Sequence, residues 1–530
     1  MIKTEISLPI KYNTATLFEA VKNALPLEKV ESSGIRILRR TLVSNRDGKP
    51  YYRATVGISL SPERERALLK IKNRFTECPE YNFTAPTFNA DFRPVVVGFG
   101  PCGLFAALTL AESGARPIVL ERGLPVDERG KRVDLFNRLG ILDPECNVQF
   151  GEGGAGTYSD GKLKSGAMDK YKMKVLSTFV DCGAREDVLY SSTAHLGTDR
   201  LGDIVRTIRE RIIALGGEIY FGARVTDVDS TDGKITSVTY EKDGSVTNIP
   251  TRAVIFATGH SAVDTVKMLR SHGLNMEARG FGIGLRIEHP REYINDVVYG
   301  ADTDYIEETA SYHLVTHLAN GRSVYSFCMC PGGTVVAAAS EPCGIVTNGM
   351  SENARMADNS NAALLVSVTP NDFASDDPLA GFELQRRIEK CAFALSGDYR
   401  APSFRLADFL DGKGTTSFTD TVPSYPRGIT HHSPDEYLPE YVTDSLRLAL
   451  PDFDNWLNGY NYPGAVLTGP ETRTTSPIRI LRDENGMASG FVGIYPAGEG
   501  AGYAGGIVSS AVDGIRIAEK LILAYSKNGV

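Results

Sequence analysis

The pattern of apolar and polar residues predicts a strand, a helix and a second strand near residue 95. Three consecutive valines, residues 95–97, form a short apolar run typical of a buried parallel strand. Apolar residues then recur with helical spacing from Leu104 to Ala111, and Gly114 follows the predicted helix. A second apolar run covers Pro117 to Leu120. Strands that alternate with helices in this way favour an α/β fold.

Residues 1–92 carry the pattern of a separate small α/β domain. Apolar and polar residues alternate from Ile2 to Leu8 and from Tyr52 to Leu60, as in half-buried strands. Three prolines within residues 79–94 indicate a linker to the next domain.

Two helices are predicted in this first domain. Thr16 and Glu19 form a capping-box pattern ahead of an amphipathic helix, and a charged helix is expected over residues 62–75. Residues 1–92 contain 15 basic and 10 acidic side chains, so this domain has a charge of about +5 while the chain as a whole has −8. The excess charge marks either a surface for RNA or another anionic partner, or a solvated helix face.

The pattern changes between residues 281 and 464. Strand-like runs alternate with long loops there, and an amphipathic helix is predicted over residues 381–396. We therefore expect an α+β domain over 281–464, inserted between two parts of one larger domain, residues 93–280 and 465–530.

Asn320-Gly321 is a strong hairpin signal inside the inserted domain. A two-residue loop would place His313 opposite Cys328, with His317 about 13 Å along the same strand. These three side chains would then be too far apart to share a metal ion, so no metal site is expected.

Composition describes an ordinary globular protein and limits its partners. The chain has 530 residues, of which 42% are hydrophobic, and its net charge of −8 gives no general reason to expect nucleic acid. The uncharged run 95–111 is short for a membrane span and contains glycine and proline. The first residues lack a signal-peptide pattern, and the eight cysteines show no disulfide framework. We expect a reduced, cytoplasmic protein with no membrane partner.

The loop after the first valine strand has the spacing of a dinucleotide-binding motif. Gly98, Gly100 and Gly103 form G-x-G-x-x-G, which suits a tight turn, a close approach to pyrophosphate and close helix–strand packing. The N-terminus of the following helix offers N–H groups to the phosphates. Glu121 ends the second strand, 23 residues after Gly98, where it can accept a hydrogen bond from a ribose 2′-OH.

Three further segments have the composition of cofactor-binding backbone. Residues 149–164 are rich in glycine, which allows a flat cofactor to approach the backbone closely. The apolar run 252–260 ends in Ala-Thr-Gly-His, and residues 490–507 lead from a strand through Gly-Glu-Gly to a helix that opens at Gly505-Gly506. Val225 falls where such folds often present backbone to an adenine ring.

These segments together resemble the FAD-binding fold of the glutathione-reductase superfamily. More narrowly, the stretches 149–163, 326–336 and 469–480 resemble a family of FAD-dependent dehydrogenases of unassigned substrate, distantly related to flavoproteins that include aminoacetone oxidase. The resemblance implies a glutathione-reductase-type, Rossmann-like FAD domain. Glu499 stands where the superfamily usually has Asp, and its longer side chain is expected to contact a ribityl hydroxyl. The residues expected to contact FAD are Gly98, Gly100, Pro101, Cys102, Gly103, Glu121, Arg122, Gly153, Gly154, Ala155, Gly156, Val225, Ala257, Thr258, Gly259, Gly498, Glu499, Gly505, Gly506 and Ile507.

The motifs also narrow the flavin chemistry. Disulfide reductases carry C-x-x-x-x-C after the first helix and a second G-x-G-x-x-G for NAD(P)H. Here Cys146 is alone in its region, and Gly280, Gly282 and Gly284 lack the spacing, so that class and a separate NAD(P) domain are not expected. What remains is transfer of a hydride from a small substrate to flavin N5. The helix that opens at Gly505 can stabilise the negative charge of a reduced flavin, and Lys162 can add to it.

Four residues leave alternatives open. Arg473 and Arg479 precede the last strand and either hold a substrate carboxylate or form structural ion pairs. Cys328 and Cys330 are either redox-active or act as small apolar residues.

Two functional classes follow. The first is an FAD-dependent oxidoreductase acting on a small, carboxylate-bearing molecule, with NAD(P)H or another electron partner bound transiently. The second is a flavoprotein acting on RNA or another macromolecule, docked through the basic N-terminal domain.

Overall fold

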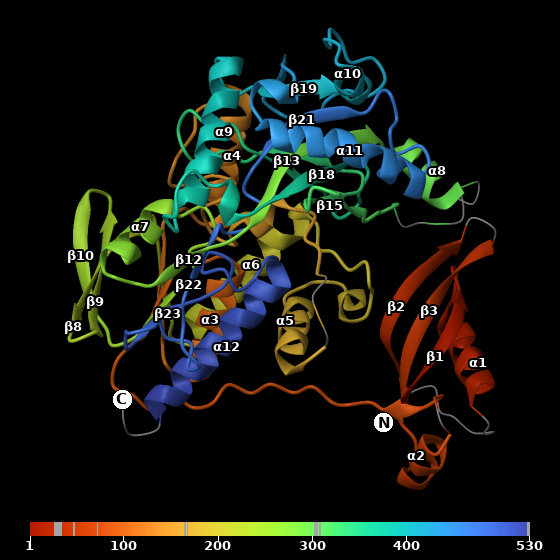
Figure 1. Cartoon of the computed structure of the whole chain (residues 1–530). Coiled ribbons are helices and arrows are strands. Elements are labelled where there is room, and N and C mark those ends of the chain that lie inside the picture. Colours follow the sequence, from red (N-terminus) through yellow and green to blue (C-terminus); the bar gives the residue numbers. More distant parts are fainter. Residues whose placement is uncertain are drawn as a thin grey trace.

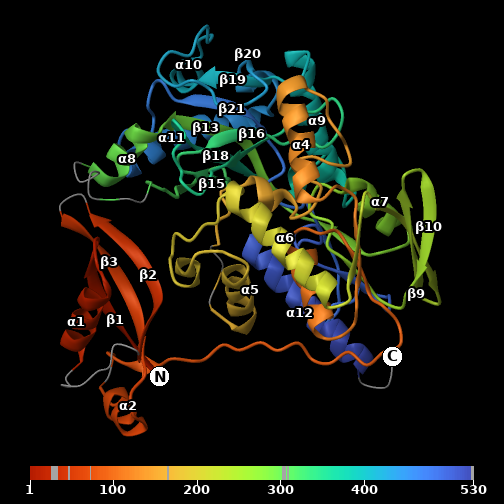
Figure 2. The ribbon, with the colours of Figure 1, turned by 180° about the vertical axis from the view of Figure 1, so that it is seen from behind.

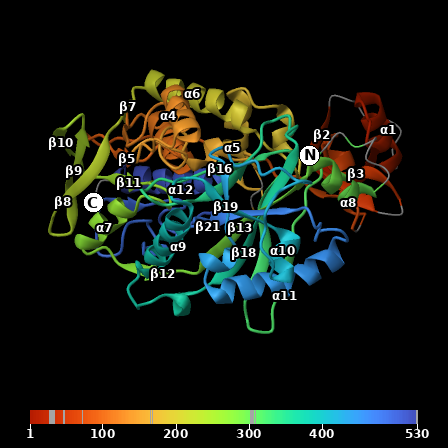
Figure 3. The ribbon, with the colours of Figure 1, turned by 90° about the horizontal axis from the view of Figure 1, so that it is seen from above.

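The computed structural model of the chain describes residues 1–526 apart from 26–33, 46–47, 72, 164–165, 167, 301–305 and 307–308. The described residues form a mixed α/β molecule. A small N-terminal domain stands beside a larger body, in which a parallel sheet lies below a seven-stranded sheet (Figure 1). The N-terminal domain and the strands β8–β10 lie at opposite ends of the molecule (Figure 3).

The N-terminal domain is a four-stranded antiparallel sheet with two helices. Its strand order is β2-β3-β1-β4, and its core holds the alternating apolar residues of the first strand, such as Ile2 and Ile6. The elements are β1 (Ile2–Pro9), α1 (Thr14–Ala24), β2 (Ile35–Asn45), β3 (Gly48–Ile58), α2 (Pro62–Leu69) and β4 (Thr76–Glu77).

Both helix predictions in this domain need correction. The N-cap of α1 is Asn13, whose side chain accepts a hydrogen bond from the backbone N–H of Thr16, so the expected capping-box pair lies inside the helix. Helix α2 ends at Leu69 rather than at residue 75, and a short strand, β4, follows it.

An extended linker joins this domain to the body and runs along its lower side (Figures 1 and 2). Phe92 of the linker packs edge-on against Tyr525 near the end of the last helix, with ring centroids 4.9 Å apart. The domain also docks directly, because Arg40 of β2 exchanges backbone hydrogen bonds of 2.8 Å with Tyr190 and Ser192.

A five-stranded parallel sheet carries the predicted cofactor motifs. Its order is β23-β11-β5-β6-β7. Strand β23, from the predicted C-terminal part of the domain, pairs with β11 from the predicted first part. Helices α3 and α12 cover it and pack on one another through apolar residues. The strands are β5 (Val95–Val97), β6 (Ile118–Glu121), β7 (Glu218–Phe221), β11 (Val254–Phe256) and β23 (Ile494–Pro496), and the larger helices are α3 (Pro101–Glu112), α4 (Val126–Leu139), α5 (Lys170–Asp181), α6 (Thr198–Ala214), α7 (Val263–Ser271) and α12 (Ile507–Ser526). A small antiparallel sheet of β8 (Arg224–Thr231), β9 (Lys234–Lys242) and β10 (Ser245–Pro250) extends from one side.

The inserted region is built on a seven-stranded sheet of order β14-β15-β18-β13-β21-β19-β20. Its strands are β13 (Phe281–Pro290), β14 (Val315–His317), β15 (Ser323–Cys330), β18 (Asn359–Val368), β19 (Ala401–Arg405), β20 (Ile429–His431) and β21 (Val466–Glu471), and its helices are α8 (Arg291–Tyr299), α9 (Ala380–Ser396), α10 (Leu406–Asp411) and α11 (Glu440–Trp456). Two short pairs complete the body, namely β16 (Thr334–Ala337) with β17 (Thr347–Met350) and β12 (Met276–Ala278) with β22 (Ile478–Ile480).

The C-terminal boundary of the inserted region differs from the expected one. Strand β21 pairs with β13 and β19, so residues 466–471 belong to the inserted sheet and not to the returning FAD domain. The chain therefore goes directly from a central strand of the upper sheet into the segment that leads back to the lower sheet.

The hairpin at Asn320-Gly321 also differs from the expected register. His317 pairs with Ser323 and Val315 with Tyr325, which is one residue away from the register of a two-residue loop. A one-residue shift moves side chains to the other face of a strand, so the expected pairing of His313 with Cys328 is wrong. In the described part of the chain, no group of three or more His, Cys, Asp or Glu residues is arranged to hold a metal ion.

Across the described residues, none of the helices is both long enough and apolar enough to cross a lipid bilayer.

Candidate functional site

A cleft lies between the parallel sheet and the inserted sheet, at the carboxyl ends of β5, β6 and β11. This is the edge of a parallel sheet where ligands usually bind. Nineteen of the predicted site residues line the cleft, namely Gly98, Gly100, Pro101, Cys102, Glu121, Arg122, Gly154, Ala155, Gly156, Lys162, Val225, Ala257, Thr258, Gly259, Arg473, Glu499, Gly505, Gly506 and Ile507.

The cleft has two sides of different construction. We call the glycine-rich side the cleft floor, and it consists of the segments 98–102, 154–156, 257–259 and 505–507 together with Glu499. We call the opposite side the cleft roof, and it consists of Phe327, Cys328, Asn348 and Glu471.

The first turn of the floor has room only for glycine at two positions. Gly98 has φ +92°, and a Cβ there would lie 2.5 Å from the carbonyl oxygen of Ala257. A Cβ on Gly103 would lie 1.9 Å from the carbonyl oxygen of Gly98. Gly103 therefore fixes the packing of α3 on β5 from behind the cleft lining, rather than contacting a ligand.

Helix α3 begins at this turn with its N-terminus open. Its N-cap is Gly100, and no side chain caps the helix. Uncapped N–H groups at a helix start form a binding site for phosphate. A Cβ on Gly100 would be in ordinary contact with Cα of Gly154, at 3.5 Å, so the glycine loop closes against the turn without side-chain bulk. This arrangement fits the pyrophosphate of a dinucleotide.

Glu121 has a broader role than the predicted ribose contact. Its carboxylate accepts three backbone hydrogen bonds, from Phe99 (2.7 Å), Gly123 (2.8 Å) and Gly151 (2.9 Å). A carboxylate offers about four acceptor positions, so one is left for a ribose hydroxyl. Glu121 thus connects three loops of the floor, and it is 4% exposed.

Two further predicted glycines lie behind the lining. Gly153 donates to the carbonyl oxygen of Phe99, at 2.9 Å, and so joins the glycine loop to the first turn. Gly498 donates to Asp513 of α12, at 2.7 Å, and a Cβ there would lie 2.8 Å from Cβ of Cys102. Both residues position the floor, and neither is part of the cleft lining.

The side-chain carboxyl group of Glu499 lies in the cleft lining. Among the described residues its carboxylate has no hydrogen-bond partner, and desolvation raises its pKa to about 7. A hydroxyl group of a ligand would satisfy this acid. Gly505 and Gly506 follow along the lining, and α12 begins at Ile507 with its N–H groups toward the same region.

The other predicted contacts lie around these segments. Arg122 lines the cleft and is fixed by ion pairs of 2.9 Å with Glu145 and Asp264. Val225, at the start of β8, lies in the lining beside the loop from Ala257 to Gly259.

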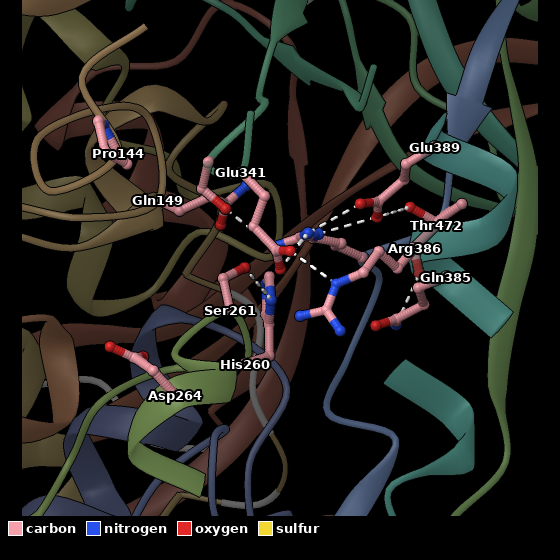
Figure 4. A network of polar contacts seen from close by, with 12 residues as sticks. Pro144, Gln149, His260, Ser261, Asp264, Glu341, Gln385, Arg386, Glu389 and Thr472 are labelled. Carbon is pink, nitrogen blue, oxygen red and sulfur yellow. Dashed lines mark hydrogen bonds and ion pairs between the residues drawn. The ribbon is translucent and has the colours of Figure 1, made fainter. Parts of the chain in front are cut away.

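Arg473 lines the cleft, but its guanidinium is occupied by the protein. It donates to Glu389 through Nε (2.9 Å) and Nη2 (2.8 Å), and also to Glu341 and Ser340. Four of the five N–H groups of Arg473 are used in this way. The structure therefore favours the structural ion pair for Arg473 over a contact with a substrate carboxylate. Figure 4 shows the carboxylates of Glu341 and Glu389 together with Arg386 and Thr472.

Arg479 lies outside the cleft lining. Its guanidinium lies over the ring of Tyr503, at 5.1 Å from the centroid, and donates to the carbonyl oxygen of Gly502 at 3.4 Å. Arg479 is thus not brought to the cleft lining with Arg473, and its contact with a substrate stays a prediction.

Lys162 lines the cleft beside Asp160. Its Nζ lies 3.3 Å from Asp160 Oδ2 and is enclosed, yet it makes no hydrogen bond among the described residues. Asp160 is already held by Arg355 through two hydrogen bonds of 2.9 and 2.5 Å. Lys162 is thus a cation of the cleft with hydrogen-bonding capacity for a ligand.

The structure adds residues that the motifs did not single out. His260 follows the Thr258-Gly259 pair and lines the cleft, where burial and then the charge of Arg473 lower its pKa to about 4. The imidazole is therefore neutral at physiological pH. Glu471 and Asn348 line the roof, and both bind the buried guanidinium of Arg286. Only the place of His260 directly after the Ala-Thr-Gly turn could have indicated its role from the sequence.

The fold and the cleft define an α/β protein with a dinucleotide site, and comparisons with known proteins agree. Residues 280–474 match the family described as "FAD-dependent protein, C-terminal domain-like". The chain is 41% identical over 525 residues to a Clostridium beijerinckii protein with the printed name "Uncharacterized protein", and the match covers 98% of this chain and 97% of that protein. The chain belongs to the same family as the Clostridium protein, and the family match confirms FAD as the predicted cofactor.

Solved structures show similarity at a greater distance. A flavoprotein/dehydrogenase from Cytophaga hutchinsonii is 13% identical, with a TM-score of 0.37 and coverage of 83% of this chain and 79% of that one. A 3-ketosteroid-Δ4-(5α)-dehydrogenase from Rhodococcus jostii is 14% identical, with a TM-score of 0.35 and coverage of 84% and 100%. These values carry no conclusion about substrate. The narrower relation to the glutathione-reductase superfamily and to aminoacetone oxidase stays a prediction.

Proposed function

We propose that the chain is an FAD-dependent oxidoreductase that takes a hydride from a small substrate. FAD would lie along the cleft floor, and the substrate would lie between the flavin and the cleft roof. The observation that carries this proposal is the uncapped start of α3, closed by the glycine loop at Gly154 and continuous with a polar roof. The alternative of a macromolecular substrate docked by the N-terminal domain stays a prediction, as do a transient NAD(P)H partner and a cytoplasmic location.

The floor would hold the cofactor mainly through backbone groups. The N–H groups at the start of α3 bind the pyrophosphate, and the free acceptor position of Glu121 binds a ribose hydroxyl. Glu499 accepts a hydrogen bond from a ribityl hydroxyl, because its carboxylate has no partner among the described residues. Bound FAD supplies a ring that accepts a hydride at N5.

The remaining groups would stabilise charge and orient the substrate. Lys162 and the start of α12 at Ile507 place positive charge at the cleft, which favours a reduced, negatively charged flavin. His260 is neutral and can accept or donate one hydrogen bond to a substrate. Asn348 adds an amide to the roof. A substrate with hydroxyl, amino or carbonyl groups fits these partners better than an apolar one.

Substitution of Gly100 tests the cofactor half of the proposal. In Gly100→Val the new Cβ meets only Gly154, at contact distance, so folding is retained while the γ-methyl groups occupy space at the pyrophosphate site. We expect at least about a tenfold loss of FAD affinity, measured by fluorescence titration of the FAD-free protein. Unchanged affinity would contradict the placement of FAD on the floor.

Anaerobic bleaching of the bound flavin tests the other half. The wild-type holoprotein is mixed with a library of small alcohols, amines and hydroxy or amino acids, and loss of the visible flavin absorbance identifies hydride donors. Gly100→Val reconstituted with excess FAD serves as the control for non-specific photoreduction. A flavin that no compound of these classes reduces would contradict the proposed direction of transfer.

A further inference from the structure

Cys328 occupies an unusual place in the cleft roof. It lies in β15 where the pairing with β18 shifts register between Phe327 and Cys330, which is a β-bulge. Its φ is +41°, in the left-handed region that residues other than glycine rarely adopt. Bulges that re-aim one side chain are frequent beside active sites. Here the bulge places the Cys328 side chain in the cleft lining, while Cys330 is fully buried behind it.

This strained conformation is fixed by two hydrogen bonds to the same atom. The carbonyl oxygen of Cys328 accepts from Arg286 Nη1, at 2.9 Å, and from the Cys330 thiol, at 3.2 Å. Arg286 is itself fixed by Glu471 and Asn348. A left-handed residue costs about 1–2 kcal/mol, and glycine would remove that strain. The role of a small apolar residue therefore does not explain a cysteine at this position.

The spacing of the two cysteines along the strand is compatible with a disulfide. A straight strand separates the Cα atoms of residues i and i+2 by about 6.6 Å, which is close to the upper limit for a disulfide. The bulge and the left-handed turn at Cys328 curl the chain, as the hydrogen bond from the Cys330 thiol to the Cys328 carbonyl shows. This curl favours closure of the pair through local movement at the bulge.

Electrostatics assigns different states to the two thiols. The neighbouring Cys330 side chain, and then the positive charges of Lys162 and Arg286, hold the pKa of Cys328 well below its ordinary value. The same contact, together with burial, raises the pKa of Cys330. A thiolate in the cleft lining with a protonated thiol behind it is the arrangement of an attacking and a resolving cysteine.

We propose that Cys328 and Cys330 form a redox-active pair that exchanges two electrons with the FAD in the cleft. In the oxidising direction the Cys330 S–H bond breaks and an S–S bond forms between the two sulfurs. The electron pair and the Cys330 proton pass to oxidised FAD, and because Cys328 enters as a thiolate no further reagent is needed. The inference rests on the proposed function, since it requires FAD in the same cleft.

The test combines electron counting with peptide mapping on the FAD-loaded, air-oxidised protein. The Cys343→Ser background is used because Cys343 is exposed and lies outside the cleft, while trypsin releases residues 323–355 with all three cysteines. Anaerobic titration with dithionite is expected to consume about four electrons per FAD, two for the flavin and two for the disulfide. After alkylation under denaturing conditions, peptide 323–355 is expected to carry no label before reduction and two labels afterwards.

Variants and controls make each outcome decisive. Cys328→Ser and Cys330→Ser in the same background are each expected to lower the consumption to about two electrons per FAD. A flavin-loaded protein that takes two electrons without these substitutions, and whose thiols are both alkylated before reduction, would overturn the dithiol pair and leave the proposed function standing. A purified protein that binds no FAD would overturn both, and the visible spectrum recorded before the titration distinguishes the two cases.

Discussion

The floor and the roof of the cleft are built in different ways. The floor is made of backbone, with glycines at Gly98, Gly100 and Gly154 and an open helix start. The roof is made of side chains around one fully buried guanidinium, that of Arg286. A backbone surface binds whatever fits its shape and N–H groups, while a buried charge network is sensitive to every partner. The difference suits an invariant cofactor on one side and a selective reaction partner on the other.

Removal of the charge at the centre of the roof should have the largest effect. In Arg286→Met, Glu471 stays buried at 3% exposure without its partner, which is expected to lower the free energy of unfolding by about 3–5 kcal/mol. The matched control is Arg206→Met, because the Arg206 guanidinium is also paired with carboxylates, those of Asp127 and Asp203, but on the surface. Its loss should be below about 1 kcal/mol. Urea unfolding compares them, and equal losses would show that the roof is no more sensitive than the surface.

A paired glycine substitution sharpens the same contrast on the floor. Gly98 and Gly114 have similar left-handed angles, φ +92° and +87°, so alanine costs about 1–2 kcal/mol of backbone strain at either position. At Gly98 the new Cβ also meets the Ala257 oxygen at 2.5 Å, whereas Gly114 is open, so Gly98→Ala should lose about 1–3 kcal/mol more. Thermal unfolding and FAD content measure both effects, and loss of FAD in Gly114→Ala would contradict the assignment of the floor.

The smallest effect concerns Glu499 of the floor. Burial raises the pKa of Glu499 to about 7, so the folded protein keeps a proton that the unfolded chain releases near pH 4.3. The free energy of unfolding of FAD-free protein should therefore fall as the pH rises from about 5 to 7 and then level off. Glu499→Gln cannot titrate and should show a shallower fall over this range in urea unfolding. Parallel curves for the two proteins would indicate that Glu499 has an ordinary pKa.

The floor could be predicted from the sequence, because its constraints act on the backbone at short range. The spacing of Gly98, Gly100 and Gly103 reflects a turn of a few residues, and such a pattern is visible in one dimension. The prediction was less accurate in its details. Gly103, Gly153 and Gly498 shape the floor without lining it, since a glycine needed for packing looks the same in a sequence as one needed for a ligand.

The roof could not be predicted, because its contacts join distant parts of the chain. Glu471 pairs with Arg286, 185 residues away, and no local pattern indicates that partner. The inserted sheet also takes β21 from the segment assigned to the FAD domain, since only pairing with β13 reveals its place. The predicted hairpin register was one residue away from the observed one, and this difference was enough to misplace Cys328. The bulge and the left-handed backbone at Cys328 have no signature in the sequence.

Helix α12 connects the cleft to the linker. It begins at Ile507 in the cleft lining and continues for 20 residues, about 30 Å, to the site where Ser526 bonds the linker at Thr87. The cofactor cleft and the linker of the N-terminal domain thus lie at the two ends of one helix. An axial shift of α12 on FAD binding would move the linker at Thr87. The rate at which a protease cuts the linker would then report whether FAD occupies the cleft at the other end of the helix.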